Sequence, residues 1–299
     1  MKHKRQHYVP KSYLQAWCDP NCPPGQTPYV WVFSKGGGQV RKKSPEKLFR
    51  ETDMYTVRTD DGQRDLTLET NLSRLEGEYS KLRKAKLGER LPLSSAERLY
   101  LCMFVAAMDG RTRAFAVHWR DNWGRVLDLG EKMERAYAAA SEEQRERMAA
   151  TLRTPGGSEE SSSMTLEEVR ELAERPIQGM LSGTVMGVAP MLFKLPFVVL
   201  ETSTAPGFIT SDAPCVWFDP ADYQTPRPRF AGGLESPTIQ ITLPLSPKQM
   251  LIFYKRFSLP GAYVHTADHE LVNLLNKKTR VAAHEYFVAN SPKARAAWF

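Results

Sequence analysis

The spacing of apolar residues divides the chain into three parts. Over 1–60, short β-branched and aromatic runs alternate with turn residues, which is typical of small strands. Over 61–195, apolar residues recur at helical spacing, as in the one-sided leucine stripe of 66–86. Over 196–299, branched runs separated by proline and glycine predict strands again, followed by a helix at 267–284 and a strand at 285–290.

This order predicts an α+β fold in a single domain over 1–299, in which the β-rich outer parts share one sheet and the helical part lies in the middle. Ser94 and Glu97 form a capping box before a long apolar helix that we expect to continue through Trp119. A polar, alanine-rich stretch over 131–152 predicts one exposed helix. A further helix begins at Thr165, and prolines at 176 and 190 predict that it is kinked or split.

Composition restricts the class of protein. The apolar fraction of 41% is ordinary for a globular protein. The net charge of +7 permits an acidic partner, such as nucleic acid, without requiring one. It contains no uninterrupted apolar run of about 18 residues, so no membrane span is expected. Four cysteines are too few for a disulfide scaffold, and the charged amino terminus lacks a signal sequence, which predicts a cytoplasmic protein.

Several motifs occur in a fixed order along nearly the whole chain. They are HYVPKSYLQAW at 7–17, VWVFSK at 30–35, SPEKLF and DMYTV within 44–57, LE at 68–69, LEGEY at 75–79, RTR at 111–113, FITSDAPCV at 208–216, TLPLSP at 242–247 and NLLNKKTRVAAHEYFVAN at 273–290. Together they resemble the DUF4238 family of bacterial proteins, whose activity is uncharacterised. The resemblance implies positions of interest without implying a reaction.

His7 and Asp212 are the first candidate site residues. An imidazole acts as acid or base near neutral pH, and His7 stands in a segment otherwise made of packing residues. Asp212 lies between two predicted strands, where a carboxylate would bind a divalent metal or activate water. The structural alternatives are a histidine bonded to backbone and an aspartate that stabilises its own turn. The catalytic hypothesis requires that both line one pocket.

Glu76 and Arg111 are expected to support this site. Glu76 lies at the edge of the leucine stripe, where an ion pair with a neighbouring helix is the structural alternative. Arg111 is expected near the middle of the most buried helix, so it needs a partner or a phosphate. Arg113 with His118 has the Arg-x4-His spacing that resembles the ribonuclease motif of HEPN proteins.

The basic residues Lys4, Arg5 and Arg113 are the candidate nucleic-acid contacts. Further basic clusters occur at 41–43, 83–86, 111–125 and 277–280, and they would form a track for a polynucleotide if they shared one face. If these clusters are scattered over the protein, they are ordinary charged residues of a solvated surface.

Two other patterns predict contacts. His3, His7, Cys18 and Cys22 have a spacing that would suit zinc, although the intervening helix is already explained by packing. In the last helix, Asn273 and Asn276 predict side-chain hydrogen bonds to a neighbouring loop, with the ITSDAP turn at 209–214 as one candidate.

The leading functional hypothesis is an enzyme that cleaves a phosphodiester, such as nucleic acid in a defence or toxin setting, with His7, Asp212, Glu76 and Arg111 at its site. No cofactor is assigned, although a divalent metal is compatible with the carboxylates. The alternatives are a non-catalytic module that binds nucleic acid or protein, and a structural role without a site.

Overall fold

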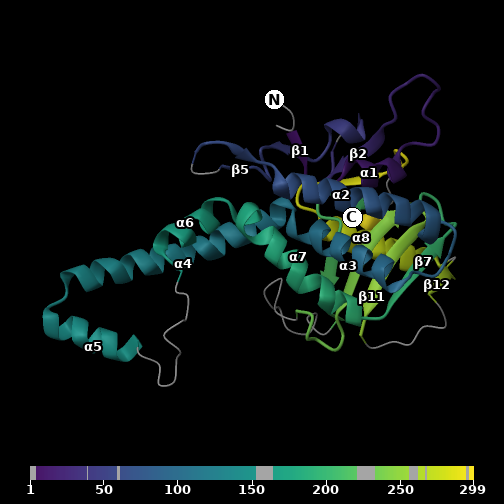
Figure 1. Ribbon diagram of the computed structural model, residues 1–299. Coiled ribbons are helices and arrows are strands. Elements are labelled where there is room, and N and C mark those ends of the chain that lie inside the picture. The colour runs from purple at the N-terminus through teal and green to yellow at the C-terminus, as the bar shows by residue number, and fades with distance from the viewer. Residues whose placement is uncertain are drawn as a thin grey trace.

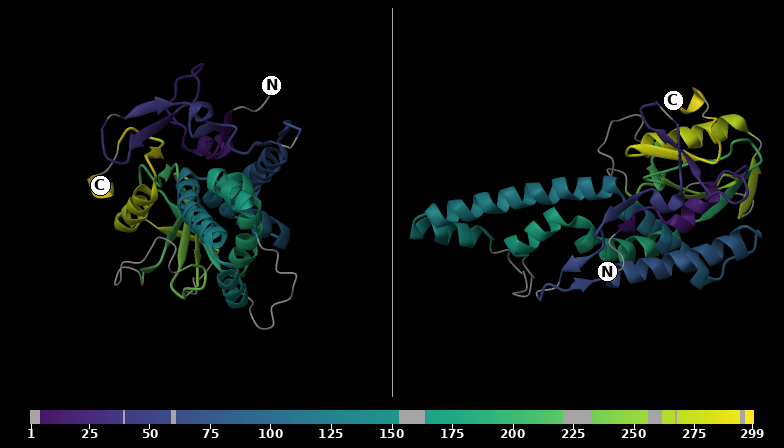
Figure 2. Two further views of the ribbon diagram at one scale, coloured as in Figure 1. Left: turned by 90° about the vertical axis from the view of Figure 1, so that its left-hand side faces the viewer. Right: turned by 90° about the horizontal axis from the view of Figure 1, so that it is seen from above.

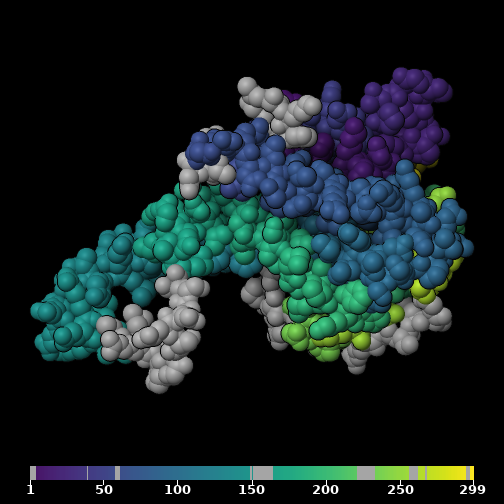
Figure 3. Space-filling model, viewed as in Figure 1, coloured from purple at the N-terminus to yellow at the C-terminus, as the bar shows by residue number. Residues whose placement is uncertain are grey.

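The structure, a computed structural model, describes residues 5–38, 40–58, 61–152, 164–220, 233–255, 262–266, 268–293 and 296–299. A body of sheets and helices carries a helical arm, which projects to the left in Figure 1 and stands clear of the body in Figure 3. The arm consists of α4 (Arg113–Ala139), α5 (Glu142–Leu152) and α6 (Leu166–Glu174). The predicted α+β class is confirmed.

A five-stranded sheet forms one part of the body. Its order is β12-β7-β11-β10-β9, with β12 parallel to β7 and all other neighbours antiparallel. The strands are β7 (Phe197–Thr202), β9 (Val216–Phe218), β10 (Gln240–Ser246), β11 (Gln249–Tyr254) and β12 (Tyr263–Thr266). β7, β10 and β11 are buried along most of their length, because they lie in the interior of the sheet under the helices.

A second sheet joins the two ends of the chain, as predicted. Its order is β3-β2-β13-β8, so a C-terminal strand pairs with an N-terminal one. The strands are β2 (Val30–Ser34), β3 (Arg41–Lys43), β8 (Thr210–Ser211) and β13 (Tyr286–Ala289). Two short antiparallel pairs complete the strands: β1 (Arg5–His7) with β4 (Arg50–Thr52), and β5 (Val57–Arg58) with β6 (Arg64–Asp65).

The helices of the body pack around α3, which is the central buried helix that its apolar sequence predicts. α3 lies against α2 and α7, and Figure 2 shows these helices stacked beside the sheets. The body contains α1 (Lys11–Leu14), η1 (Gln15–Trp17), η2 (Pro45–Lys47), α2 (Thr67–Leu82), η3 (Arg83–Leu87), α3 (Ser95–Gly110), α7 (Pro176–Lys194), α8 (His269–Ala282) and η5 (Ala296–Trp298).

Two predicted helices are each divided in two. The apolar helix expected to reach Trp119 ends at Gly110, and α4 begins afresh because the Thr112 hydroxyl caps it by accepting the Phe115 N–H. The exposed helix predicted over 131–152 breaks at 140–141, where Ser141 and Gln144 exchange side-chain and backbone hydrogen bonds. The prediction of a split at Pro176 is confirmed, whereas Pro190 is accommodated inside α7.

The N-terminal motif anchors the C-terminal sheets. Tyr13 and Trp17 are fully buried, and each forms a hydrogen bond far along the chain. The Tyr13 hydroxyl donates to the carbonyl of Pro244 at 2.7 Å, and the Trp17 Nε1–H donates to the carbonyl of Phe208 at 2.9 Å. Motif residues from 7–17, 208–216 and 242–247 therefore meet at one junction.

Among the described residues, the helices are all too short or too polar to cross a bilayer.

Candidate functional site

His7 lies at the end of β1 and is half-buried. Its Nε2 lies 3.1 Å from the carbonyl oxygen of Glu46, which can only accept, so Nε2 carries the proton. Burial lowers the pKa of His7 below 6.5, although the Glu46 carbonyl and the charge of Glu76 raise it in part. The imidazole is therefore held neutral and oriented, which is compatible both with a structural role and with proton transfer.

The lowered pKa of His7 predicts a pH dependence of stability. A neutral form favoured by folding contributes stability above pH 6.5, and this contribution is lost as the pH falls through the lower pKa of the folded state. Urea unfolding of the wild type and of His7→Gln should therefore converge as the pH falls from about 7.5 to 5. A difference between the two proteins that is constant with pH would contradict this role.

Glu76 and Arg111 form an ion pair between α2 and the end of α3. Arg111 Nη1 donates to Glu76 Oε1 at 2.7 Å, and the Arg111 side chain is only 1% exposed. Because Arg111 is sealed in this pair, it has no access to a phosphate. Glu76 is partly exposed and also acts on the pKa of His7. Arg111 therefore supports Glu76, whose charge reaches His7.

Asp212 has a different role from the predicted one. Its carboxylate accepts three backbone N–H groups, from His284, Glu285 and Tyr286, at 2.7, 2.7 and 2.9 Å, and the residue is 2% exposed. Burial raises the pKa of Asp212, although the three N–H donors lower it in part. The carboxylate does not contact His7 and is closed to ligands. Asp212 connects the strand β8 to the start of β13.

The asparagines of α8 act as predicted. The Asn276 side chain accepts the Ile209 N–H at 3.0 Å and donates to the carbonyl of Gly207 at 2.9 Å, just before the ITSDAP turn. Asn273 accepts the Trp298 Nε1–H at 3.1 Å. With Asp212, these bonds make the C-terminal motifs a buried polar network that fixes the loop 202–209.

Two of the predicted nucleic-acid contacts of the N-terminal half, Arg5 and Arg113, both lie beside β4. The Arg113 guanidinium is bound to Glu51, lies 3.7 Å from a Glu285 oxygen and stacks on the Tyr8 ring, so its charge is compensated. Arg5 is exposed on β1. Lys4 lies outside the described residues.

The zinc alternative gains no support from the described ranges, where no three His, Cys, Asp or Glu side chains gather as metal ligands. His3 lies outside those ranges.

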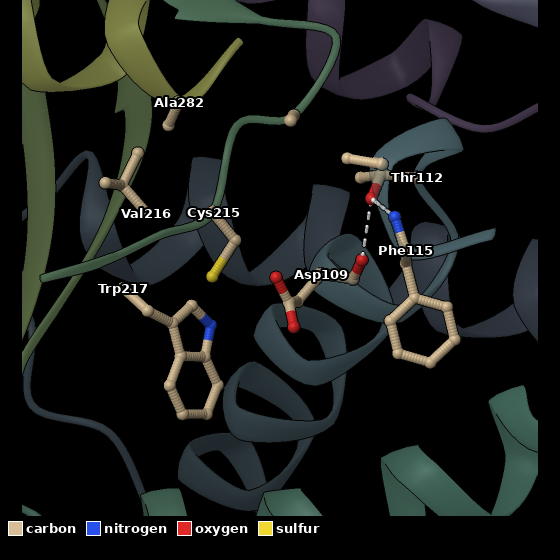
Figure 4. A pocket seen from close by; sticks show the side chains of 9 residues that line it. Asp109, Thr112, Phe115, Cys215, Val216, Trp217 and Ala282 are labelled. Atoms are coloured by element: carbon tan, nitrogen blue, oxygen red, sulfur yellow. Dashed lines mark hydrogen bonds between the residues drawn. The ribbon is translucent and has the colours of Figure 1, made fainter. Parts of the chain in front are cut away.

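A small cavity lies between the α3–α4 junction and β9. Figure 4 shows the Cys215 thiol and the Asp109 carboxylate facing each other there, beside the Trp217 indole. Its volume of about 40 Å³ is room for one water molecule, whose share of liquid volume is about 30 Å³. Burial raises the pKa of Cys215 well above its usual range, so the thiol stays protonated and is a poor nucleophile.

A larger cleft, of about 360 Å³, lies between β4 and the base of the arm. Three guanidinium groups face it, from Arg113, Arg120 and Arg175, together with three carboxylates from Glu51, Asp53 and Glu174. Because these charges balance, the cleft has no preference for a polyanion.

A larger hollow is a groove at the end of the body opposite to the arm, where β7 and β12 lie in Figure 1. It has two sections of about 1000 and 730 Å³. Both sections are lined by the same four residues, which are Thr202, Ser203, Ser246 and Lys248. The two sections therefore adjoin at these residues, at the end of the TLPLSP motif.

Two Ser-Pro-Lys turns with the same internal hydrogen bond line this groove. In the first, the Lys248 N–H donates to the Ser246 hydroxyl at 3.2 Å, and in the second the Lys293 N–H donates to the Ser291 hydroxyl at 3.3 Å. Each turn places an exposed lysine at the groove. Two separate segments thus share one tripeptide and one hydrogen bond, and each brings a lysine to the groove.

The groove is basic. It is lined by five cationic side chains and two carboxylates, which are Arg83, Lys84, Arg90, Lys248 and Lys293 against Glu89 and Glu201. Within the described part of the chain, Lys84, Lys248 and Lys293 form no ion pair, and the buried Nε of Arg83 has no hydrogen-bond partner. Hydroxyl and amide groups, from Ser, Thr and Asn, lie between the cations. This combination is typical of phosphate contacts in nucleic-acid-binding proteins.

Sequence reasoning found Arg83 and Lys84 as one basic cluster but missed the lysines of the two turns. The repeated tripeptide Ser-Pro-Lys, at 246–248 and 291–293, was the signal that would have identified them.

The family described as protein of unknown function DUF4238 matches residues 5–293 of the 299, so the chain belongs to this family. Neither the curated proteins nor the solved structures contain a match to the chain.

Proposed function

We propose that this protein binds nucleic acid through the sugar–phosphate backbone, in the groove formed by η3, the end of β7, and the two Ser-Pro-Lys turns. The observation that carries the proposal is the pair of Ser-Pro-Lys turns, because both present unpaired lysines to the same section of the groove. Unpaired cations bind phosphates with release of counterions, which supplies most of the affinity of sequence-independent binding.

The lining of the groove favours the backbone over the bases. Among the described residues that line it, His265 supplies a ring but no Phe, Tyr or Trp is present, so the groove offers little of the base stacking on which single-strand binders rely. Small hydroxyl and amide groups leave space for a chain of phosphates. The proposed binding is therefore weakly dependent on base sequence.

The test is the affinity of the purified protein for fluorescently labelled oligonucleotides, measured by anisotropy as a function of salt concentration. A slope of log K against log salt of about −2 to −4 is expected from three to five phosphate contacts at about 0.7 each. Affinity that is absent at low salt, or that does not depend on salt, would refute the proposal.

Cleavage of a phosphodiester is a second candidate function, favoured by the neighbourhood of His7 and Glu76. In this proposal His7 transfers a proton, the charge of the Glu76 carboxylate favours the protonated form of His7, and Arg111 positions Glu76. Asp212 takes no part, since its carboxylate is closed to ligands. Incubation of the protein with RNA and DNA, with and without Mg²⁺ or Mn²⁺, tests the reaction. Cleavage that persists unchanged in His7→Gln would show that the reaction does not depend on His7.

A further inference from the structure

Glu201 is an acidic residue in the basic groove. It lies near the end of β7, is 9% exposed, and lines the same section as Lys84 and Lys248. A carboxylate beside a phosphate site repels the ligand, so a groove that held phosphates alone would bind them better without it.

The Glu201 carboxylate is held in one orientation. Gln249 lies opposite it on β11 and donates from Nε2 to Oε1 at 2.9 Å, and Arg90 donates to Oε2 at 2.7 Å. The Gln249 amide is itself fixed, because it also donates to the carbonyl of Leu87 at 2.8 Å. Each carboxylate oxygen accepts up to two hydrogen bonds, so both retain capacity for a donor from the groove.

An oriented carboxylate selects a ligand group that donates a hydrogen bond. Along a nucleic-acid backbone, the phosphates are acceptors, and the 2′-hydroxyl is the donor that the sugar supplies within a strand. DNA lacks this hydroxyl. The ring of His265, opposite Glu201 on β12, is available to stack on one base, and no Phe, Tyr or Trp lines this section, so the sugar next to the bound phosphates is the group expected to meet Glu201.

We infer that Glu201 accepts a hydrogen bond from a ribose 2′-hydroxyl, so that the groove selects RNA over DNA. This inference rests on the proposed function. Lys84 and the lysines of the two turns hold the phosphates, and Glu201 reads the sugar between them. The pairing of Glu201 with Arg90 limits the repulsion of neighbouring phosphates.

The experiment compares oligouridine of about ten nucleotides in three forms: RNA, DNA, and 2′-fluoro RNA, which keeps an RNA-like sugar conformation without the hydroxyl donor. The wild type should bind RNA about tenfold more tightly than either of the others, as a charge-assisted hydrogen bond predicts. Glu201→Gln should reduce this preference to below about twofold. Glu89→Gln, which removes an exposed carboxylate from the same groove, should retain it.

The outcomes separate the inference from the proposed function. Equal binding of RNA and DNA by the wild type overturns the inference and leaves the proposed function intact, whereas no binding of either overturns both. Tight binding of 2′-fluoro RNA assigns the preference to sugar conformation and also overturns the inference. Glu201→Asp keeps the charge but withdraws the carboxylate, so it should lose the preference as well. If either variant fails to fold, the three oligonucleotides still decide the matter on the wild type.

Discussion

Replacing Lys84, Lys248 and Lys293 together by glutamine is expected to lower the affinity for a single-stranded oligonucleotide about 50-fold at about 0.15 M salt. Each lysine is exposed, forms no ion pair within the described ranges, and lines the groove. Loss of three phosphate contacts should also reduce the slope of log K against log salt by about 2, at about 0.7 for each contact. Anisotropy titrations at several salt concentrations measure both quantities.

The matched control is the triple variant of Lys43, Lys47 and Lys277, three exposed lysines that lie outside the groove. It changes the net charge by the same amount. A control that loses as much affinity as the groove variant would show that binding follows net charge, and would contradict the assignment of the groove. Melting temperatures of both variants should be close to that of the wild type, because exposed lysines contribute little to stability.

The second large effect is expected on stability. Replacing Asp212 by alanine removes the shared acceptor of three part-buried N–H groups, from His284, Glu285 and Tyr286. A hydrogen bond to a charged group contributes about 1.5 to 3 kcal/mol, so the free energy of unfolding should fall by about 3 to 5 kcal/mol. Chemical denaturation followed by circular dichroism measures this loss.

Asp268 provides the control for Asp212. It also accepts two backbone N–H groups, from Glu270 and Leu271, but it does so at the exposed start of α8. Water replaces the lost acceptor there, so Asp268→Ala should cost only about 1 kcal/mol, as for other caps. Equal losses for the two variants would show that burial of the Asp212 network contributes nothing.

Part of this polar network can be predicted from the sequence. Paired asparagines in α8 are poor helix formers, so their hydrogen bonds to a neighbouring loop were predictable, as was an ion pair for Glu76. The role of Asp212 stayed open because the local sequence Ser-Asp-Ala-Pro fits both a turn and a catalytic carboxylate. Only the position of β13 shows that backbone amides occupy its oxygens.

The groove was beyond prediction for a different reason. Its cations come from η3 and the residues just after it, the β10–β11 turn and the segment after β13, which are far apart in the sequence. Pairing of β13 with β2 and of β10 with β11 brings these segments to one end of the body. Helix periodicity does not predict the break at 111–112, because the apolar pattern continues on both sides of it. The break is caused by Thr112, which caps the start of α4.

The most direct measurement is photocrosslinking of the protein to RNA that contains 4-thiouridine, followed by mass spectrometry of the crosslinked peptides. Binding in the groove predicts crosslinks within 83–90, 201–206, 246–248 and 290–293, and their loss in the variant of Lys84, Lys248 and Lys293. Crosslinks concentrated on the α4–α5 arm or on β3 would contradict the account.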